Sequence, residues 1–168
     1  MNKNDLRYIK TEKTIKDTYI FLKKKYRTQI KVIELCKAAM INKSTFYSHY
    51  ETIDCLHKEL SREIIQDTIN DSLNIDIIKN DLETFVYSII KSLKDNSVII
   101  DLMFGDDKVE LVGCVEECIV SYISKYNGLK AKEKEIVFAI GGAAYLLMTN
   151  LDKETISAAI KLIHKTIN

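Results

Sequence analysis

Apolar residues recur along this 168-residue chain at the three- and four-residue spacing of amphipathic helices. The clearest patterns predict helices over Asp81 to Asn96, over a segment that ends near Tyr126, and over a last segment capped by Asp152. The inward positions are Leu82, Phe85, Val86, Ile89 and Leu93; Leu111, Val115, Cys118, Ile119, Tyr122 and Tyr126; and Ile156, Ala159, Ile160, Ile163 and Ile167. The chain has no Pro and only 5 Gly, which favours helices over a sheet of hairpins. We therefore predict an all-α fold of about nine helices.

The N-terminal part carries weaker helical patterns. A first helix is predicted from about Asp5 or Thr11 to Lys25, and another opens at Glu51-Thr52. Their inward positions are Ile15, Thr18, Tyr19, Leu22 and Tyr26 in the first, and Ile53, Leu56, Leu60 and Ile64 in the second. His57 falls on the polar side and is predicted to face solvent. The stretch Asn70 to Asn80 is rich in Asp and Asn, which favours a loop or a frayed connection.

The stretch Ile30 to Tyr50 predicts two short helices joined by a tight turn. Helical spacing covers Val32 to Ala39, the pattern breaks at Met40-Ile41, and Asn42 is a favourable N-cap for a helix that begins at Lys43. This arrangement fits either a helix-turn-helix or an ordinary helical hairpin of an all-α core.

The composition of the second short helix favours the helix-turn-helix. Phe46 and Tyr50 are four residues apart and can both pack inward. The remaining side chains include no acid, and they are Lys43, Ser44, Thr45, Tyr47, Ser48 and His49. A solvated helix face normally mixes both charge signs, so this face is suited to an anion such as DNA.

The run from Asn42 to Leu56, NKSTFYSHYETIDCL, resembles the signature of the tetracycline-repressor (TetR) type of bacterial transcriptional regulators. The resemblance is specific over roughly Thr11 to Leu60 and sharpest at Thr45-Phe46-Tyr47 and His49-Tyr50. It implies a three-helix DNA-binding head and a helical body that dimerises and can bind a small effector. The DNA-binding positions assigned on this basis are Lys31, Asn42, Lys43, Ser44, Thr45, Tyr47, Ser48 and His49. Thr45 is expected at a base edge or phosphate, and Tyr47 at a phosphate.

Three positions depart from the family pattern. Met40 stands where Gly is usual, so a residue with a side chain must bear a left-handed or altered turn. Lys31 replaces the usual Thr at the start of the bracing helix. Ile53 replaces a Lys that usually contacts phosphate, which puts that contact in doubt.

The net charge of +1 conceals an asymmetry. Residues 1–60 carry 13 Lys+Arg and 7 Asp+Glu, a difference of +6, whereas residues 61–168 carry 12 and 17, a difference of −5. Chance clustering is one explanation, and a DNA-binding head on an acidic body is the other. We predict a head over residues 1–52 and a dimerisation and effector-binding body over residues 53–168.

Other classes of function have little support in the sequence. There is no recognisable catalytic motif, so we expect no enzyme, no cofactor and no metal site. The four Cys lack paired spacing and are expected to be small buried hydrophobic residues in a reducing cytoplasm. The polar N-terminus is not a signal peptide, and the longest apolar run, Ile136 to Met148, is too short to span a bilayer.

The last two predicted helices are expected to form the dimer interface. The helix from Glu133 to about Asn150 is apolar nearly all round, and its small residues would allow close approach of another helix. Packing within the same chain is the competing explanation. The interface residues predicted are Ala139, Gly142, Ala143, Leu146, Ile156, Ala159, Ile160 and Ile163.

An effector pocket is harder to locate, because aromatic and Met residues at helical spacing most often fill a plain core. Candidate lining residues are Tyr87, Met103, Phe104, Tyr122, Phe138 and Tyr145. The leading hypothesis is a homodimeric regulator, most often a repressor in this family, on a palindromic double-stranded DNA operator. The alternative is a protein-interaction module, such as a co-activator, with weak or lost DNA recognition.

Overall fold

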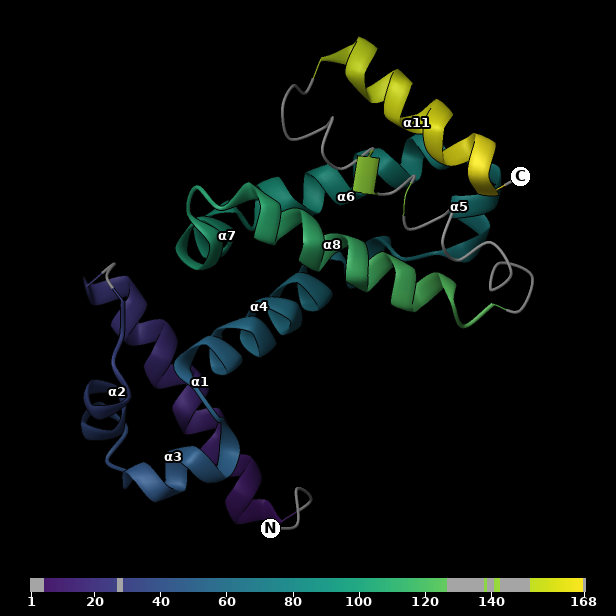
Figure 1. Ribbon diagram of the computed structural model, residues 1–168. Helices are drawn as coiled ribbons and strands as arrows, with labels where there is room; N and C mark the ends of the chain where they lie inside the picture. Colours follow the sequence, from purple (N-terminus) through teal and green to yellow (C-terminus); the bar gives the residue numbers. More distant parts are fainter. Residues whose placement is uncertain (1–4, 27–28, 127–137, 139–140, 143–151, 168) are drawn as a thin grey trace. The chain divides into compact units, whose positions relative to one another are not determined.

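In the computed structural model the described residues form helices joined by short connections, and they contain no strand (Figure 1). The described residues are 5–26, 29–126, 138, 141–142 and 152–167. They form nine α-helices and one short 3-10 helix, which confirms the predicted all-α fold. The chain divides into a first unit, residues 1–61, and a second unit, residues 62–168. This boundary lies nine residues after the predicted one, because the start of the fourth helix belongs to the first unit.

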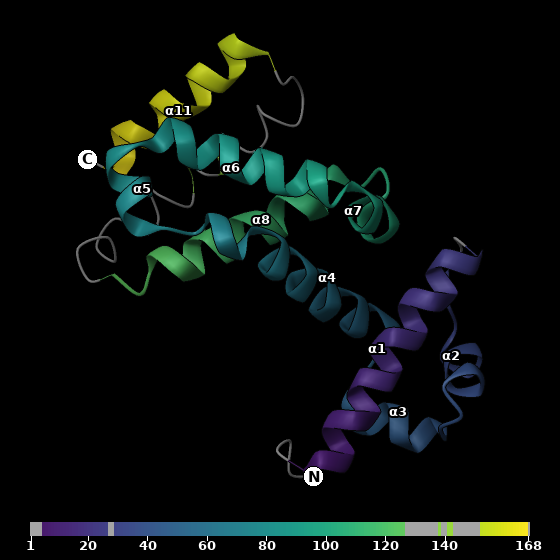
Figure 2. The same cartoon turned by 180° about the vertical axis from the view of Figure 1, so that it is seen from behind.

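The first unit is built on three helices and the beginning of a fourth. They are α1 (Leu6–Tyr26), α2 (Val32–Ala38), α3 (Lys43–His49) and α4 (Ile53–Ile69). Helix α2 packs against both α1 and α3 (Figures 1 and 2). The buried apolar side chains are Tyr8, Ile15, Tyr19, Leu22, Ile30, Leu35, Cys36, Ala39, Phe46, Tyr50, Leu56 and Leu60. Each helix therefore contributes one apolar face to a shared core.

Two residues of the first unit lie differently from the prediction. Tyr26 was predicted to face inward but is 53% exposed, because α1 ends there. The centroid of its ring lies 5.0 Å from the Lys25 ammonium. His57 does not simply face solvent. It is half-buried, and its Nδ1 lies 3.1 Å from the hydroxyl of Tyr19 on α1.

The second unit continues with the rest of α4 and six more helices. They are the 3-10 helix η1 (Asn70–Ser72), α5 (Ile75–Asn80), α6 (Leu82–Asp95), α7 (Ser97–Phe104), α8 (Lys108–Ile123) and α11 (Lys153–Ile167). Helix α6 contacts η1, α5, α7 and α11, so it is central to this unit (Figure 2). The buried apolar side chains of the second unit are Ile65, Ile69, Ile78, Phe85, Val86, Ile89, Ile100, Met103, Phe104, Cys114, Val115, Cys118, Ile119, Ile123, Ile156 and Ala159.

Side-chain caps explain where several of these helices begin. Asp81, Asp107 and Asp152 each accept a backbone N–H three residues ahead, at 3.1, 2.9 and 2.7 Å. Asn74 does the same for α5, accepting from the N–H groups two and three residues ahead. The prediction of a loop over Asn70 to Asn80 was therefore wrong, because the cap and the buried Ile78 support short helices there.

The ends of two helices also depart from or refine the prediction. Gly105 stops α7 with φ of +53°, a left-handed value that favours glycine. Helix α8 ends at Ile123, so Tyr126 lies beyond it and donates a hydrogen bond from its hydroxyl to that of Tyr122 at 3.2 Å. The predicted cap at Asn127-Gly128 lies outside the described residues. No helix in the described part of the chain combines the length and apolarity needed to cross a membrane.

Candidate nucleic-acid interface

Helix α2 begins without the usual hydroxyl cap. Lys31 occupies the N-cap position, and its backbone N–H donates to the carboxylate of Glu34, three residues on, at 3.0 Å. This bond is one of the two that make up a capping box, and it satisfies the backbone N–H of Lys31. The other bond is missing, because a Lys side chain has no acceptor for the backbone N–H of Glu34. Leu35 and Cys36 are buried below, while the Lys31 side chain stays exposed. The departure at Lys31 therefore leaves the helix start intact.

The turn after α2 is a left-handed cap built on a residue with a side chain. Met40 has φ of 54° and is 92% exposed. The N–H of Ile41 donates to Cys36 O at 3.0 Å and that of Met40 to Lys37 O at 3.4 Å, the pair of bonds that defines a Schellman motif. The prediction that Met40 bears a left-handed turn is confirmed.

Helix α3 is anchored by one aromatic face. Phe46 is completely buried, and Tyr50, the residue after the last turn, is nearly so, with ring centroids 6.0 Å apart. Asn42 holds the N-cap position in an extended conformation, as predicted. Its side chain, however, makes no capping hydrogen bond, so that part of the prediction was wrong. The anchored side fixes which residues of α3 point outward.

The outward face of α3 carries one ammonium group and several hydroxyls. Lys43, Ser44 and Ser48 are exposed, and Tyr47 is 55% exposed. Thr45 is half-buried, and its carbonyl accepts the Ser48 hydroxyl at 2.7 Å. No acidic residue lies within α3. The structure thus brings most of the predicted DNA-binding side chains onto one accessible surface.

His49 lies differently from that group. Its imidazole stacks on the ring of Tyr8 with centroids 3.9 Å apart and an interplanar angle of 26°. Both ring nitrogens are buried, with no hydrogen-bond partner among the described residues. Burial lowers the pKa of His49, and the nearby Glu12 carboxylate partly opposes that shift. We correct its assignment accordingly: His49 joins α3 to α1 and does not offer its ring to a ligand.

Sequence reasoning missed Tyr8. It is buried in the first unit and lies seven residues before Ile15, in register with the inward positions of α1. That spacing was a usable signal. Uncertainty over whether the helix began at Asp5 or Thr11 left Tyr8 without an assigned role.

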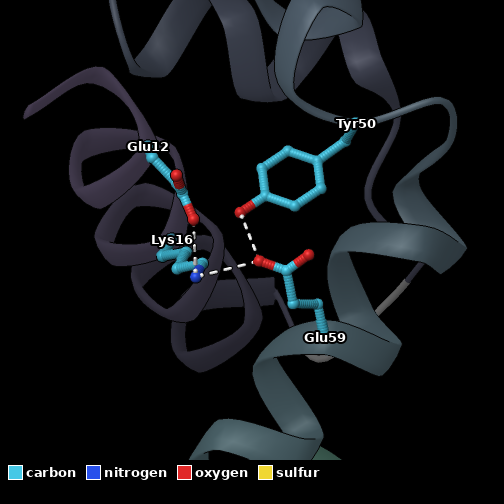
Figure 3. Close-up of polar contacts among 4 residues, drawn as sticks. All are labelled: Glu12, Lys16, Tyr50 and Glu59. Carbon is cyan, nitrogen blue, oxygen red and sulfur yellow. Dashed lines mark hydrogen bonds and ion pairs between the residues drawn. The ribbon is translucent and has the colours of Figure 1, made fainter. Parts of the chain in front are cut away.

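A polar cluster, defined as Glu12, Lys16, Tyr50 and Glu59, ties the end of α3 to α1 and α4 (Figure 3). The Lys16 ammonium lies 3.0 Å from a Glu12 oxygen and 3.1 Å from a Glu59 oxygen. That same Glu59 oxygen accepts the Tyr50 hydroxyl at 3.3 Å. Burial raises the pKa of Tyr50 far above its usual value, so its hydroxyl remains a donor. The cluster therefore holds Tyr50, the residue that follows α3, against α1 and α4.

The candidate pocket residues differ in their exposure. Met103 and Phe104 are buried in the core, and Tyr122 is half-buried. Tyr87 and Phe138 are exposed, Phe138 by 76%, and Tyr145 lies outside the described residues. An open groove of about 670 Å³ does occur elsewhere in the second unit. Its lining residues are Arg62, Glu63, Gln66, Asp67, Glu117, Cys118 and Ser121. None of them had been predicted to line a pocket.

Two charged residues that line this groove form an ion pair. The Arg62 guanidinium contacts Glu117 through Nε at 2.6 Å and Nη2 at 3.1 Å, which raises the pKa of Arg62. Cys118 is buried beside it. Burial raises the pKa of Cys114 to about 11 and also raises that of Cys118, so both stay protonated thiols. Cys36 is also buried but Cys55 is exposed, so the prediction of buried Cys is right for three of four.

The predicted dimer residues that can be described are largely engaged within one chain. A Cβ atom on Gly142 would lie 3.2 Å from Leu162 Cδ2, so the missing side chain accommodates α11 of the same chain. Ile156 and Ala159 are buried on α11, which packs on α6, and Ile160 is half-buried. We correct the assignment of Ile156 and Ala159, which a partner cannot reach. Ala139, Ala143, Leu146 and the Ile163 side chain lie outside the described residues.

Comparisons with known proteins add no relative, since no protein-family model, no curated protein and no solved structure matches this chain. The function must therefore be argued from the chemistry of its own residues.

Proposed function

We propose that this protein is a sequence-specific DNA-binding regulator of the TetR type that acts as a homodimer. The observation that carries the proposal is the outward face of α3. Lys43 and the hydroxyls of Ser44 and Tyr47 are accessible together, and no carboxylate of α3 accompanies them. Ser48 is exposed beside them, with its hydroxyl donating to the Thr45 carbonyl. Ammonium and hydroxyl groups are donors to phosphate oxygens and base edges in the major groove.

The packing behind α3 supports this proposal. A recognition helix has to present its outer face at a fixed angle, and α3 has only seven residues with which to do so. Phe46 anchors its middle, the Tyr8–His49 stack holds its last turn, and the polar cluster holds Tyr50. A helix this short is not stable on its own in water, so these three contacts hold it in place.

The charge distribution and the family resemblance point the same way. The excess of +6 over residues 1–60 would attract the polyanion and speed its capture. Within the resemblance, the two aromatic positions Phe46 and Tyr50 are buried, while Tyr47 between them is exposed. A family signature that served only an internal hairpin would have no need for the exposed tyrosine.

A second candidate is a protein-interaction module. Ile33 on α2 and Met40 in the turn that follows are exposed apolar residues. Such side chains suit a protein surface better than a phosphate backbone. This candidate predicts binding to another protein and no saturable binding to DNA.

Titration of fluorescein-labelled duplexes distinguishes the two. The duplexes come from the DNA flanking the gene for this chain, with a shuffled duplex of equal length and composition as control. The proposal predicts saturable binding at low salt that the unlabelled flanking duplex displaces at lower concentration than the shuffled one. Equal displacement by both, or no binding, would leave the interaction module as the better account.

A further inference from the structure

The exposed chemistry of α3 is unusually restricted for a helix that reads bases. The helix consists of Lys43, Ser44, Thr45, Phe46, Tyr47, Ser48 and His49. Phe46 is buried and His49 is stacked on Tyr8, so neither is presented outward. What remains is one ammonium, four hydroxyls, one aromatic ring and the methyl group of Thr45. Within α3 there is no guanidinium and no carboxamide.

This composition limits which bases the side chains of α3 can recognise by hydrogen bonds; the exposed carboxamide of Asn42, at the N-cap position, precedes the helix. Guanine is read by two bonds from Arg or Lys to O6 and N7, and adenine by two bonds from Asn or Gln to N6 and N7. A hydroxyl both donates and accepts, so it pairs with several base edges and distinguishes them poorly. Lys43 is the one side chain of α3 able to reach guanine in this way, and it is the first residue of the helix.

Two of the side chains that remain have apolar groups with a specific counterpart in DNA. Thymine alone places a methyl group in the major groove, and apolar side chains recognise it by contact. The half-buried Thr45 carries a methyl group at the centre of α3, and Tyr47, two positions further on, carries an exposed aromatic ring. We infer that α3 selects its site chiefly through thymine methyl groups, so that each operator half-site is rich in A·T pairs. This inference rests on the proposed function.

Selection from a pool of random duplexes, followed by replacement of thymine with uracil, tests it. Uracil keeps the base pair and removes only the methyl group. Each contacted methyl should contribute about fourfold to affinity, the ratio expected for burying one methylene-sized group. Replacement of a contacted thymine by uracil should therefore weaken binding about fourfold for each methyl group removed. Replacement outside the half-sites should not weaken binding.

Variants of the protein assign the contacts. Thr45→Ser removes one methyl and keeps the hydroxyl, so it should weaken binding to the thymine duplex about fourfold. It should also make binding insensitive to uracil at one position of each half-site. Tyr47→Ala should do the same at another position. Thr14→Ser, the same chemical change at an exposed site on α1, is the matched control and should alter neither. Circular dichroism confirms that each variant remains folded.

The outcomes separate this inference from the proposed function. Enriched sites whose invariant positions are G·C pairs, with no effect of uracil, would overturn thymine reading and leave DNA binding standing. A pool that yields no enriched sequence would overturn both. Enriched A·T-rich sites whose uracil sensitivity survives in Thr45→Ser and in Tyr47→Ala would also overturn it, because the methyl contacts would then come from elsewhere.

Discussion

The imidazole of His49 lies flat on the ring of Tyr8, joining the last turn of α3 to the beginning of α1. The two residues are separated by 41 positions, and the contact leaves both imidazole nitrogens buried. Burial of this kind favours the neutral ring, because the second proton would add a positive charge that is removed from water and has no hydrogen-bond acceptor among the described residues. The contact that joins α3 to α1 therefore depends on the protonation state of His49.

That relationship predicts how stability depends on pH. The pKa of His49 is lowered in the folded protein, so the unfolded chain binds more protons once the pH falls below about 6.5. The stabilising contribution is complete above that pH and is lost as the pH falls toward the folded-state pKa. Thermal melts between pH 7.5 and 5 should show a smaller decrease in Tm for His49→Phe than for the natural chain, because Phe keeps the stack and cannot titrate. Identical decreases would contradict this role.

Met40 predicts a stabilising substitution. A residue with a side chain at positive φ costs about 1 kcal/mol relative to Gly, and Met40 is so exposed that removing its side chain loses little packing. Met40→Gly should therefore increase the free energy of unfolding by about 1 kcal/mol in a urea titration. Met40→Ala is the control: it loses the same side chain but keeps the strain, and should show no such gain. An equal gain in stability in both variants would mean that the Met40 side chain, and not the backbone conformation, destabilises the natural protein.

The polar cluster predicts a modest loss on removal of one hydroxyl. Tyr50→Phe leaves the buried ring in place and deletes the donor to Glu59, which should reduce the free energy of unfolding by about 1 kcal/mol. Because the cluster holds the residue that follows α3, affinity for DNA should fall while the salt dependence of binding stays the same. A change in salt dependence would instead place the Tyr50 hydroxyl at a phosphate.

Much of the fold could be read from spacing alone, and particular residues show why the rest could not. The pattern Leu82, Phe85, Val86 and Ile89 predicts α6 because a helix that packs on one side needs only local periodicity. The stack of His49 on Tyr8 depends on how α1 crosses α3, which no local pattern encodes. The short helix α5 could have been predicted, because Asn74 is a recognisable N-cap. The high content of Asp and Asn around it led instead to the prediction of a loop.

The candidate site divides in the same way. Its outward residues follow from the inward position of Phe46, which the sequence indicates directly. The role of Gly142 could not be decided from the sequence. A small residue is expected both where a partner chain approaches closely and where α11 of the same chain does. The position of Leu162 favours the second explanation for Gly142.

The dimer remains a prediction, and Ala143 tests it. A two-fold dimer would place two copies of α3 about 34 Å apart, matching a palindrome. Ala143→Arg should convert the protein to a monomer near 19.3 kDa in light scattering and weaken operator binding with it. Lys91→Arg, a conservative change at an exposed site on α6, should leave the mass unchanged. An Ala143→Arg protein that stays dimeric would exclude that interface.

The salt dependence of DNA binding tests the central claim most directly. If Lys43 contacts a phosphate, Lys43→Ala should reduce the slope of log K against log salt concentration by about one for each protomer bound, and weaken binding to every sequence alike. Lys91→Ala, an exposed lysine on α6, is the matched control and should leave the slope unchanged. A Lys43→Ala protein that is folded and has the same slope as the Lys91→Ala protein would contradict the assignment of α3 as the DNA-binding surface.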